Sequence, residues 1–359
     1  MNTERKIRVL VVEDSAVVRE LLEYIIAADP RLEVVAAVET AEEALRILDR
    51  AAPDVISMDI RLPGMNGFEA TQRIMASRPT PIVVVSASVE SEELNITMNN
   101  ALRAGALAVV EKPVGITRQD YQQVAARLCT QLVIMSEVRV VKQRNDRGFQ
   151  LGAGTSSDRI RRVSAQPGPR PHTPFRLLGV VASAGGPGAL VQLFEGLGAA
   201  FPLPILLVQH ITASFLHGFV AWLDSVCPFS VVIAADGDIP APGRVYVPPP
   251  DHHLCFDAGV LRTNVGPLVA LQRPSGTVLL QSMARSLGAQ AIGVILTGMG
   301  EDGAAGLLEL REAGGFTIAE DETTAVVYGM PAAAVRLGAA CETLPLDAIA
   351  SRIAKICLE

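Results

Sequence analysis

The stretch IRVLVVEDSAVVRELLEYIIA, residues 7–27, decides the fold of the first part of the chain. It opens with a short apolar run, Ile7–Val12, and then carries apolar residues at helical spacing from Ala16 to Ala27. Further apolar runs, each followed by a polar or amphipathic stretch, are Val34–Val38, Val55–Met58, Ile82–Ser86 and Ala108–Val110. Such alternation predicts a doubly wound α/β domain, a parallel sheet with helices on both faces, over residues 1–125.

Charged and polar residues stand where these predicted strands end, which is where parallel sheets collect functional groups. Glu13, Asp14 and Asp59 would converge on one rim, and clustered carboxylates of this kind suit Mg²⁺. Asp59 beside that cation could attack phosphorus as a nucleophile. Ser86 and Lys112 could then hold the phosphoryl oxygens by a hydrogen bond and an ion pair.

The α/β alternation resumes at Leu177 and continues to the end of the chain. Ser183 follows the apolar run Leu178–Ala182, and His210 follows Ile205–Gln209. Asp302 comes shortly after Ala291–Thr297, and Phe316–Ala319 is a further predicted strand. The three polar residues are therefore expected on one edge of a parallel sheet. Together they are the parts of nucleophilic acyl transfer, with serine as nucleophile, histidine as base and aspartate orienting the imidazole.

A dinucleotide site is the rival interpretation of the same region. Gly298–Gly303 reads GxGxxG between a strand and a helix, and Glu320 and Asp321 follow the next strand, where a ribose-binding acid would lie. The carboxylates of Glu301 and Asp302 would however repel a pyrophosphate at that helix start. This interpretation also leaves Ser183 and His210 unexplained, so we disfavour it.

The distribution of charge separates the chain into three pieces. Residues 1–125 carry 13 Lys+Arg against 19 Asp+Glu (−6), residues 126–176 carry 10 against 3 (+7), and residues 177–359 carry 8 against 16 (−8). The acidic C-terminal block disfavours nucleic-acid binding. A predicted helix, Tyr121–Val141, runs into the middle piece. The residues after this helix are rich in Gly, Ser, Pro and Arg, which is typical of a linker.

Other classes of protein are disfavoured by composition. The five cysteines are scattered singly without metal-ligand spacing, which indicates free thiols in a reducing cytosol. No signal peptide precedes the first strand, and the long uncharged runs after Leu177 are interrupted by Gly and Pro, so we expect no membrane insertion. His252 and His253 follow three prolines and are expected to be exposed or structural histidines of a loop.

The first block resembles the receiver domain of bacterial two-component response regulators. The resemblance rests on Glu13-Asp14, on Asp59 followed by Leu62-Pro63-Gly64-Met65-Asn66-Gly67, on Ser86 and on Lys112-Pro113. It implies a flavodoxin-like fold, phosphorylation of Asp59 by a histidine kinase, and Mg²⁺ as the cofactor. The aromatic switch residue that many receivers carry three positions before the lysine is Val109 here, which leaves the usual aromatic route of signalling in doubt.

The C-terminal block resembles the protein-glutamate methylesterase/glutaminase (CheB) domain of bacterial chemotaxis, a Rossmann-like α/β fold. Matching stretches are Ala182–Pro187, Val208–His210, Gly243–Tyr246, Gln272–Ser275, Leu296–Gly303, Ala319–Glu322 and Tyr328–Pro331. The resemblance places the nucleophile on Ser183, the base on His210 and the orienting acid on Asp302, with the Met299 N–H as an oxyanion donor and no cofactor. It departs at Ala184, usually Thr, which removes a hydroxyl beside the site, and at Gly276-Thr277, usually Val-Asp, a change that we expect to affect the edge of the substrate groove.

The resemblance implies a cytoplasmic, phosphorylation-regulated enzyme with a receiver at 1–125, a helix extension and basic linker at 126–176, and a methylesterase domain at 177–359. Its substrates would be glutamate γ-methyl esters, and glutamines, on methyl-accepting chemoreceptors, and its phosphodonor a chemotaxis histidine kinase. The linker arginines would hold the acidic blocks together or attract acidic receptor helices. The alternative of another class is a receiver fused to a catalytically silent receptor-binding module.

Overall fold

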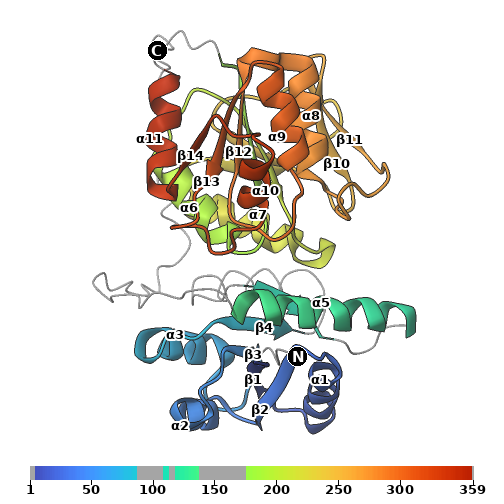
Figure 1. Cartoon of the computed structure of the whole chain (residues 1–359), viewed down its shortest axis with the longest axis vertical. Helices are drawn as coiled ribbons and strands as arrows, with labels where there is room; N and C mark the ends of the chain where they lie inside the picture. The colour runs from blue at the N-terminus through green and yellow to red at the C-terminus, as the bar shows by residue number, and fades with distance from the viewer. Residues whose placement is uncertain (1–4, 87–107, 113–117, 137–174, 358–359) are drawn as a thin grey trace, which may run out of the picture.

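A computed structural model describes residues 5–86, 108–112, 118–136 and 175–357 of the chain (Figure 1). The described residues form two parallel sheets flanked by helices and one small antiparallel hairpin. Of the expected linker, which runs to residue 176, residues 137–174 lie outside the described residues. Among the described residues, no helix is long and apolar enough to cross a membrane.

The first sheet has the strand order β2-β1-β3-β4-β5, all parallel, as expected for a flavodoxin-like domain. Its strands are β1 (Ile7–Val12), β2 (Leu32–Val38), β3 (Val55–Asp59), β4 (Ile82–Ser86) and β5 (Ala108–Glu111). The helices are α1 (Ala16–Ala28), α2 (Ala41–Ala51), α3 (Gly67–Ser77) and α5 (Arg118–Ser136). Thr40 and Asn66 begin α2 and α3 by accepting a backbone N–H with their side chains.

Strands β3 and β4 and most of β1 are buried on both faces, which explains their continuous apolar sequences, whereas β2 at the edge is mostly half-buried. Leu10 and Val12 of β1 pack with α2 and α3, whereas Val9 and Val11 pack with α1 and α5. Helix α5 runs to Ser136, and its Leu128, Leu132 and Met135 belong to the second of these cores. The core of this first domain therefore continues along α5 beyond residue 125.

The second sheet has the order β14-β13-β12-β6-β7-β9-β8, again all parallel. Its strands are β6 (Leu177–Ala182), β7 (Ile205–Gln209), β8 (Ser230–Ile233), β9 (Arg244–Val247), β12 (Ala291–Ile295), β13 (Phe316–Glu320) and β14 (Glu342–Leu344). The helices are α6 (Gly186–Leu197), α7 (Ala213–Val226), α8 (Gly276–Leu287), η1 (Gly288–Gln290), α9 (Ala304–Glu312), α10 (Met330–Arg336) and α11 (Leu346–Ile356). β10 (His253–Asp257) and β11 (Val260–Asn264) form the hairpin.

The two faces of this sheet build two cores. Helices α6, α7 and α11 cover one face, and α8, α9, α10 and the hairpin cover the other. The chain passes from β6 to β7 on one side, while β12 pairs with β6 on the other. The ends of β12, β6 and β7 therefore meet where the winding of the sheet reverses, which is the usual place for a ligand site in such folds.

The expected strands are present, with small differences at their ends. The predicted run Ala291–Thr297 is strand β12 only as far as Ile295, and the Thr297 N–H beyond it donates to the Glu320 side chain, 2.7 Å away. His253 was expected in a loop, but it is the first residue of β10 and is buried.

Candidate active site and phosphorylation site

Ser183 stands at the sharp turn between β6 and α6. Its N–H donates to the Thr297 carbonyl over 3.0 Å, which ties the turn to the end of β12. Gly185 follows with φ +77°, and a Cβ there would lie 2.5 Å from Val326. At Gly186 a Cβ would lie 2.1 Å from the Gln209 side-chain oxygen. Both glycines are therefore needed for the close packing that exposes the serine at the edge of the sheet.

His210 follows β7, whose last residue, Gln209, pairs with Ala182 of β6. This register sets His210 beside Ser183. The His210 Nε2 lies 2.8 Å from Asp302 Oδ2, while Nδ1 is buried and makes no hydrogen bond among the described residues. Asp302 therefore fixes the Nε2–H tautomer, and Nδ1 is left as the acceptor available to a neighbouring hydroxyl.

Asp302 is almost fully buried and is surrounded by donors. Besides His210, its oxygens accept the Ser275 hydroxyl at 2.6 Å and the N–H groups of Gly276 and Thr277 at 2.6 and 3.1 Å. The N-terminus of α8 thus points at this carboxylate. Burial alone raises the pKa of Asp302, but the hydrogen bonds from His210, Ser275 and Gly276 outweigh it and hold the pKa below its ordinary value. The carboxylate is ionised at neutral pH.

The Met299 turn closes the other side of the site. Gly298 lies so close to Ser183 that a Cβ at Gly298 would be 2.8 Å from the serine Cβ. Within the described part of the chain the Met299 N–H donates no hydrogen bond, so it is free to serve an oxyanion. The Thr297 N–H, just before this turn, is held by Glu320, a fully buried carboxyl at the end of β13.

Sequence reasoning gave no supporting role to several residues that hold this site together. Gln209 donates from Nε2 to the carbonyls of Ser183 and His210, at 2.8 and 3.1 Å. The Thr297 hydroxyl donates to the Ala184 carbonyl at 2.8 Å. Gln209, Thr297 and Ser275 all lie inside the quoted motifs, but nothing in those motifs indicates which groups their side chains contact.

Gly276 and Thr277, the departure that we expect to affect the edge of the substrate groove, are buried and donate their N–H groups to Asp302. Thr277 also accepts the Gly303 N–H with its hydroxyl at 2.8 Å, and a Cβ at Gly276 would lie 2.3 Å from Val181. The geometry also argues against a dinucleotide at Gly298–Gly303. Glu320, the candidate ribose ligand, is buried, and the Gly303 N–H is already used.

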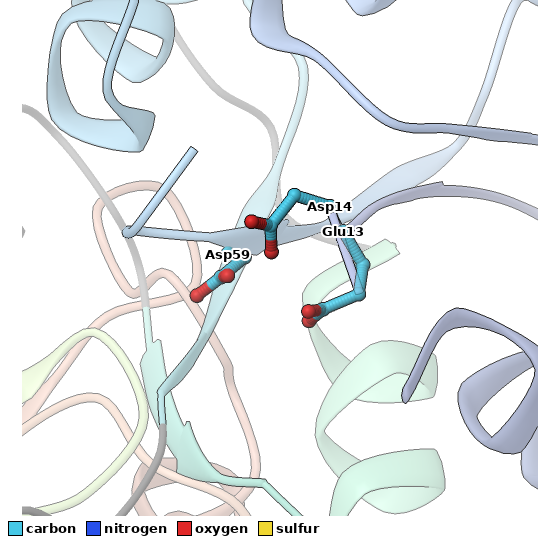
Figure 2. A group of neighbouring side chains, drawn as sticks. All are labelled: Glu13, Asp14 and Asp59. Atoms are coloured by element: carbon cyan, nitrogen blue, oxygen red, sulfur yellow. The ribbon is translucent and has the colours of Figure 1, made fainter. Parts of the chain in front are cut away.

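The first sheet brings its own predicted residues together at the ends of β1, β3 and β5. Glu13, Asp14 and Asp59 each place a carboxylate oxygen within 4.8 Å of the others (Figure 2). The Lys112 ammonium lies 2.7 Å from Glu13 Oε2 and 2.9 Å from Asp59 Oδ2. Glu13 and Asp59 are buried, whereas Asp14 is exposed, so the cluster is open on one side. Three carboxylates with such access fit Mg²⁺ as a donor set.

Burial raises the pKa of Glu13, and the neighbouring Asp59 raises it further, against the lowering effect of Lys112. Burial lowers the pKa of Lys112, but its hydrogen bonds to Glu13 and Asp59 outweigh this and raise it. Ser86 is buried at the end of β4, where its carbonyl accepts the Lys112 N–H at 2.8 Å. The side chain of Val109 lies outside the described residues.

Comparisons with known proteins agree with this geometry. The chain matches the family model "CheB methylesterase" over residues 178–353 and the model "Response regulator receiver domain" over residues 9–121. It is 59% identical to protein-glutamate methylesterase/protein-glutamine glutaminase 2 of Paramagnetospirillum magneticum, over 99% of this chain and 98% of that protein. The protein-glutamate methylesterase/protein-glutamine glutaminase of Nitrosospira multiformis is 42% identical over 98% of both chains.

A solved structure gives a further comparison. The crystal structure of the Thermotoga maritima CheB methylesterase catalytic domain is 33% identical, with a TM-score of 0.49, and covers 51% of this chain and 98% of that one. The assignment of the chain to a family rests on the near full-length relatives and on the two matching family models. The chain belongs to the CheB methylesterase family and carries a response regulator receiver domain before its catalytic block.

Proposed function

We propose that the chain hydrolyses glutamate γ-methyl esters on chemoreceptors to glutamate and methanol, and deamidates receptor glutamines at the same site. The names of its full-length relatives support both activities. The observation that carries the proposal is the hydrogen bonding of the two His210 ring nitrogens. One ring nitrogen is bonded to the buried Asp302, and the other makes no hydrogen bond within the described residues, while the pairing of β6 with β7 brings the backbone of His210 next to that of Ser183. The catalytic block would comprise residues 177–359, the receiver 1–125 and the connecting segment 126–176.

In the first half of the reaction, Ser183 Oγ attacks the ester carbonyl carbon and His210 Nδ1 takes the hydroxyl proton. Ionised Asp302 holds the Nε2–H and stabilises the imidazolium that forms. The Met299 N–H would donate to the tetrahedral oxyanion, and such a donor contributes roughly 10²–10³ in rate. The C–O bond then breaks, and His210 returns its proton to the departing methanol.

In the second half, water attacks the acyl-Ser183 carbonyl carbon and gives a proton to His210 Nδ1. The bond between the acyl carbon and Ser183 Oγ breaks, and the same proton returns to the serine. Glutamate is released, and its carboxyl ionises. A glutamine substrate passes through the same acyl-serine, with ammonia leaving in place of methanol.

We further propose that Asp59 accepts a phosphoryl group from a histidine kinase. Glu13, Asp14 and Asp59 would hold Mg²⁺, which would offset the negative charge gathered there. Asp59 Oδ would form the bond to phosphorus as the bond to the donor nitrogen breaks. Lys112, already 2.9 Å from Asp59, would pair with the new phosphoryl oxygens, and Ser86 would donate a hydrogen bond to them.

Contact between the blocks supports regulation by that step. Ala184, directly after Ser183, and Val326 and Val327 pack against the receiver core that contains α1 and α5. Phosphorylation at Asp59 would favour a state in which this contact is released. The substrate glutamates lie on cytoplasmic receptor helices in this proposal, so the protein would act in the cytoplasm.

Methanol release from methylated receptor tests the esterase. Ser183→Ala should abolish it, whereas retained activity would exclude Ser183 as the nucleophile. A fluorophosphonate probe should label the wild-type chain at Ser183. Failure to label would instead favour the catalytically silent receptor-binding module.

The same assay tests the receiver. With a small-molecule phosphodonor and Mg²⁺, the wild-type rate should rise, and Asp59→Asn should keep only the unstimulated rate. If the Asp59→Asn chain is still stimulated, phosphorylation of Asp59 is not the switch.

A further inference from the structure

A tight turn between β11 and α8 has an unusual backbone. Val269 and Gln272 exchange both backbone hydrogen bonds, at 3.1 and 2.9 Å, and the two residues between them are Ala270 and Leu271. These have φ +49° and +62°. Two successive left-handed residues are the pattern of a type I′ turn, which strongly prefers Asn-Gly or similar pairs because other side chains are strained there.

The same molecule contains a less strained turn of this kind. The β10–β11 hairpin turns at Ala258 and Gly259, with φ +48° and +89°, and has glycine at the second position. The Val269–Gln272 turn has leucine at that position. Strain retained at a residue without a fold-related need is often associated with a ligand-binding role.

Leu271 contributes nothing to the core, since 86% of it is exposed, the largest fraction among the exposed large hydrophobic residues that the structure describes. Its loop is nevertheless anchored. Arg273 donates to the carbonyls of Val265 and Gly266 at 3.3 and 2.9 Å, and His253 Nε2 bonds to the Pro267 carbonyl at 2.9 Å. The leucine is thus held out into solvent by a fixed support.

Leu271 lines a groove of about 560 Å³ beside the proposed active site. Gly300 and Glu301, from the turn that carries Asp302, line the same groove, as do Tyr328 and Arg336. The groove is therefore continuous with the turn that borders Ser183. Arg336 is exposed and makes no ion pair within the described parts of the chain.

We propose that this groove binds the chemoreceptor helix that carries the methyl ester, with Leu271 as the apolar anchor that determines specificity for the folded receptor. The proposal rests on the proposed esterase function. A glutamyl side chain is short, so the helix that presents it to Ser183 has to lie across the adjoining surface. An amphipathic helix fits that surface, because Leu271 would meet its apolar side while Glu301 and Arg336 would meet its charged side.

The test compares two substrates for the full chain with a phosphodonor. One is a methylated receptor cytoplasmic fragment, and the other is a short peptide with a single glutamate γ-methyl ester. For Leu271→Gln, the ratio of kcat/KM on receptor to kcat/KM on peptide should fall about tenfold or more. The matched control is Ile239→Gln, which removes a 75%-exposed residue that does not line the groove, and it should keep the ratio.

A second variant separates docking from folding. Ala270→Asn with Leu271→Gly supplies the preferred turn residues, so it should raise the Tm of the catalytic block by about 2–4 °C while the ratio still falls. An unchanged ratio in both variants, or an equal loss on both substrates, would overturn the docking role. If the wild-type chain releases methanol from neither substrate, it is the esterase function that fails.

Discussion

Both blocks gather carboxylates at the carboxyl ends of parallel strands, but they balance the charge differently. In the receiver, Glu13 and Asp59 share the ammonium of Lys112, which lies within 3 Å of each. In the catalytic block, no Lys or Arg of the described residues pairs with Asp302, which instead accepts four hydrogen bonds from His210 and the start of α8.

The difference teaches how the two sites are suited to different chemistry. The receiver cluster is balanced by charges that can be exchanged, so a metal ion or a phosphoryl group can change its balance. Asp302 is held by fixed dipoles that need no rearrangement during a reaction, which is the arrangement expected for stabilising an imidazolium. The pKa values follow the same division, since burial leaves the pKa of Glu13 raised while hydrogen bonds leave that of Asp302 lowered.

The largest expected effect comes from removing the Asp302 carboxylate from its ring of hydrogen-bond donors. Asp302→Asn replaces an acceptor by an NH₂ group that faces N–H and O–H donors, and it no longer fixes the Nε2–H tautomer of His210. We expect kcat for methanol release to fall by roughly 10³–10⁴, as for loss of the acid in other Ser-His-Asp sites. Fluorescence of Trp222, the single tryptophan and a core residue of this block, reports whether the variant is folded.

The matched control is Glu312→Gln, an exposed acid on α9, which should leave kcat within twofold. A loss of less than tenfold in folded Asp302→Asn would show that the carboxylate does not orient the base.

Removing the cation from the Glu13, Asp59 and Lys112 cluster should change the free energy of unfolding of the receiver more than the rate of methanol release. Lys112→Met leaves the buried Glu13 and Asp59 facing each other without a cation, and removing one partner of a buried ion pair costs about 3 kcal/mol. The deficit should be larger at pH 8 than at pH 5, because the pKa of Glu13 rises further in the variant, and its protonation at low pH removes the repulsion. Urea unfolding followed by circular dichroism measures it.

Two features make this measurement selective. Unfolding of the receiver should leave the Trp222 fluorescence unchanged, and added Mg²⁺ should stabilise the variant more than the wild type. Arg73→Met removes an exposed pair with Glu69 and should cost less than about 1 kcal/mol. Equal losses in the two variants would mean that Lys112 is not a buried charge partner.

The sequence predicts the parts of both sites that depend on strand order and register. Ile7–Val12, Ile82–Ser86 and Ile205–Gln209 are strands with the expected bounds, and the residues after them converge because parallel strands end together. The donors around Asp302 are different. Ser275 reaches it from a helix start 27 positions earlier in the chain, a contact set by how α8 packs on the sheet.

The sequence of the Leu271 turn does not predict its backbone conformation. Val-Ala-Leu-Gln has none of the Gly, Asn or Asp residues that indicate a type I′ turn. The hydrogen bonds that anchor its loop come from Arg273 and His253, which lie outside the turn and are not indicated by its sequence.

The smallest expected effect concerns Glu320, a carboxyl that has neither a cation, as Glu13 and Asp59 have, nor the set of donors that surrounds Asp302. Glu320 is fully buried in the catalytic block, where its Oε2 accepts the Thr297 N–H and its Oε1 has no hydrogen bond within the described residues. Burial, with a smaller contribution from Asp321, raises its pKa to about 6 from an ordinary value of 4.5. The folded state therefore holds this proton more tightly than the unfolded state, so stability is lost as pH rises from about 4.5 to 6.

Glu320→Gln keeps an acceptor for the Thr297 N–H and removes the ionisation. Relative to wild type, the variant should gain about 2 kcal/mol between pH 4.5 and pH 7.5, as a pKa difference of this size requires. Urea unfolding followed by Trp222 fluorescence at the two pH values measures the gain, and Glu322→Gln, an exposed neighbour, should show none. If the gain is absent, the ionised Glu320 is stabilised in the folded state as well as Asp302 is. The difference in how carboxylates are stabilised would then hold only between the receiver and the catalytic block. If the gain appears, the catalytic block contains both kinds of carboxyl, and fixed donors are reserved for the one that contacts His210.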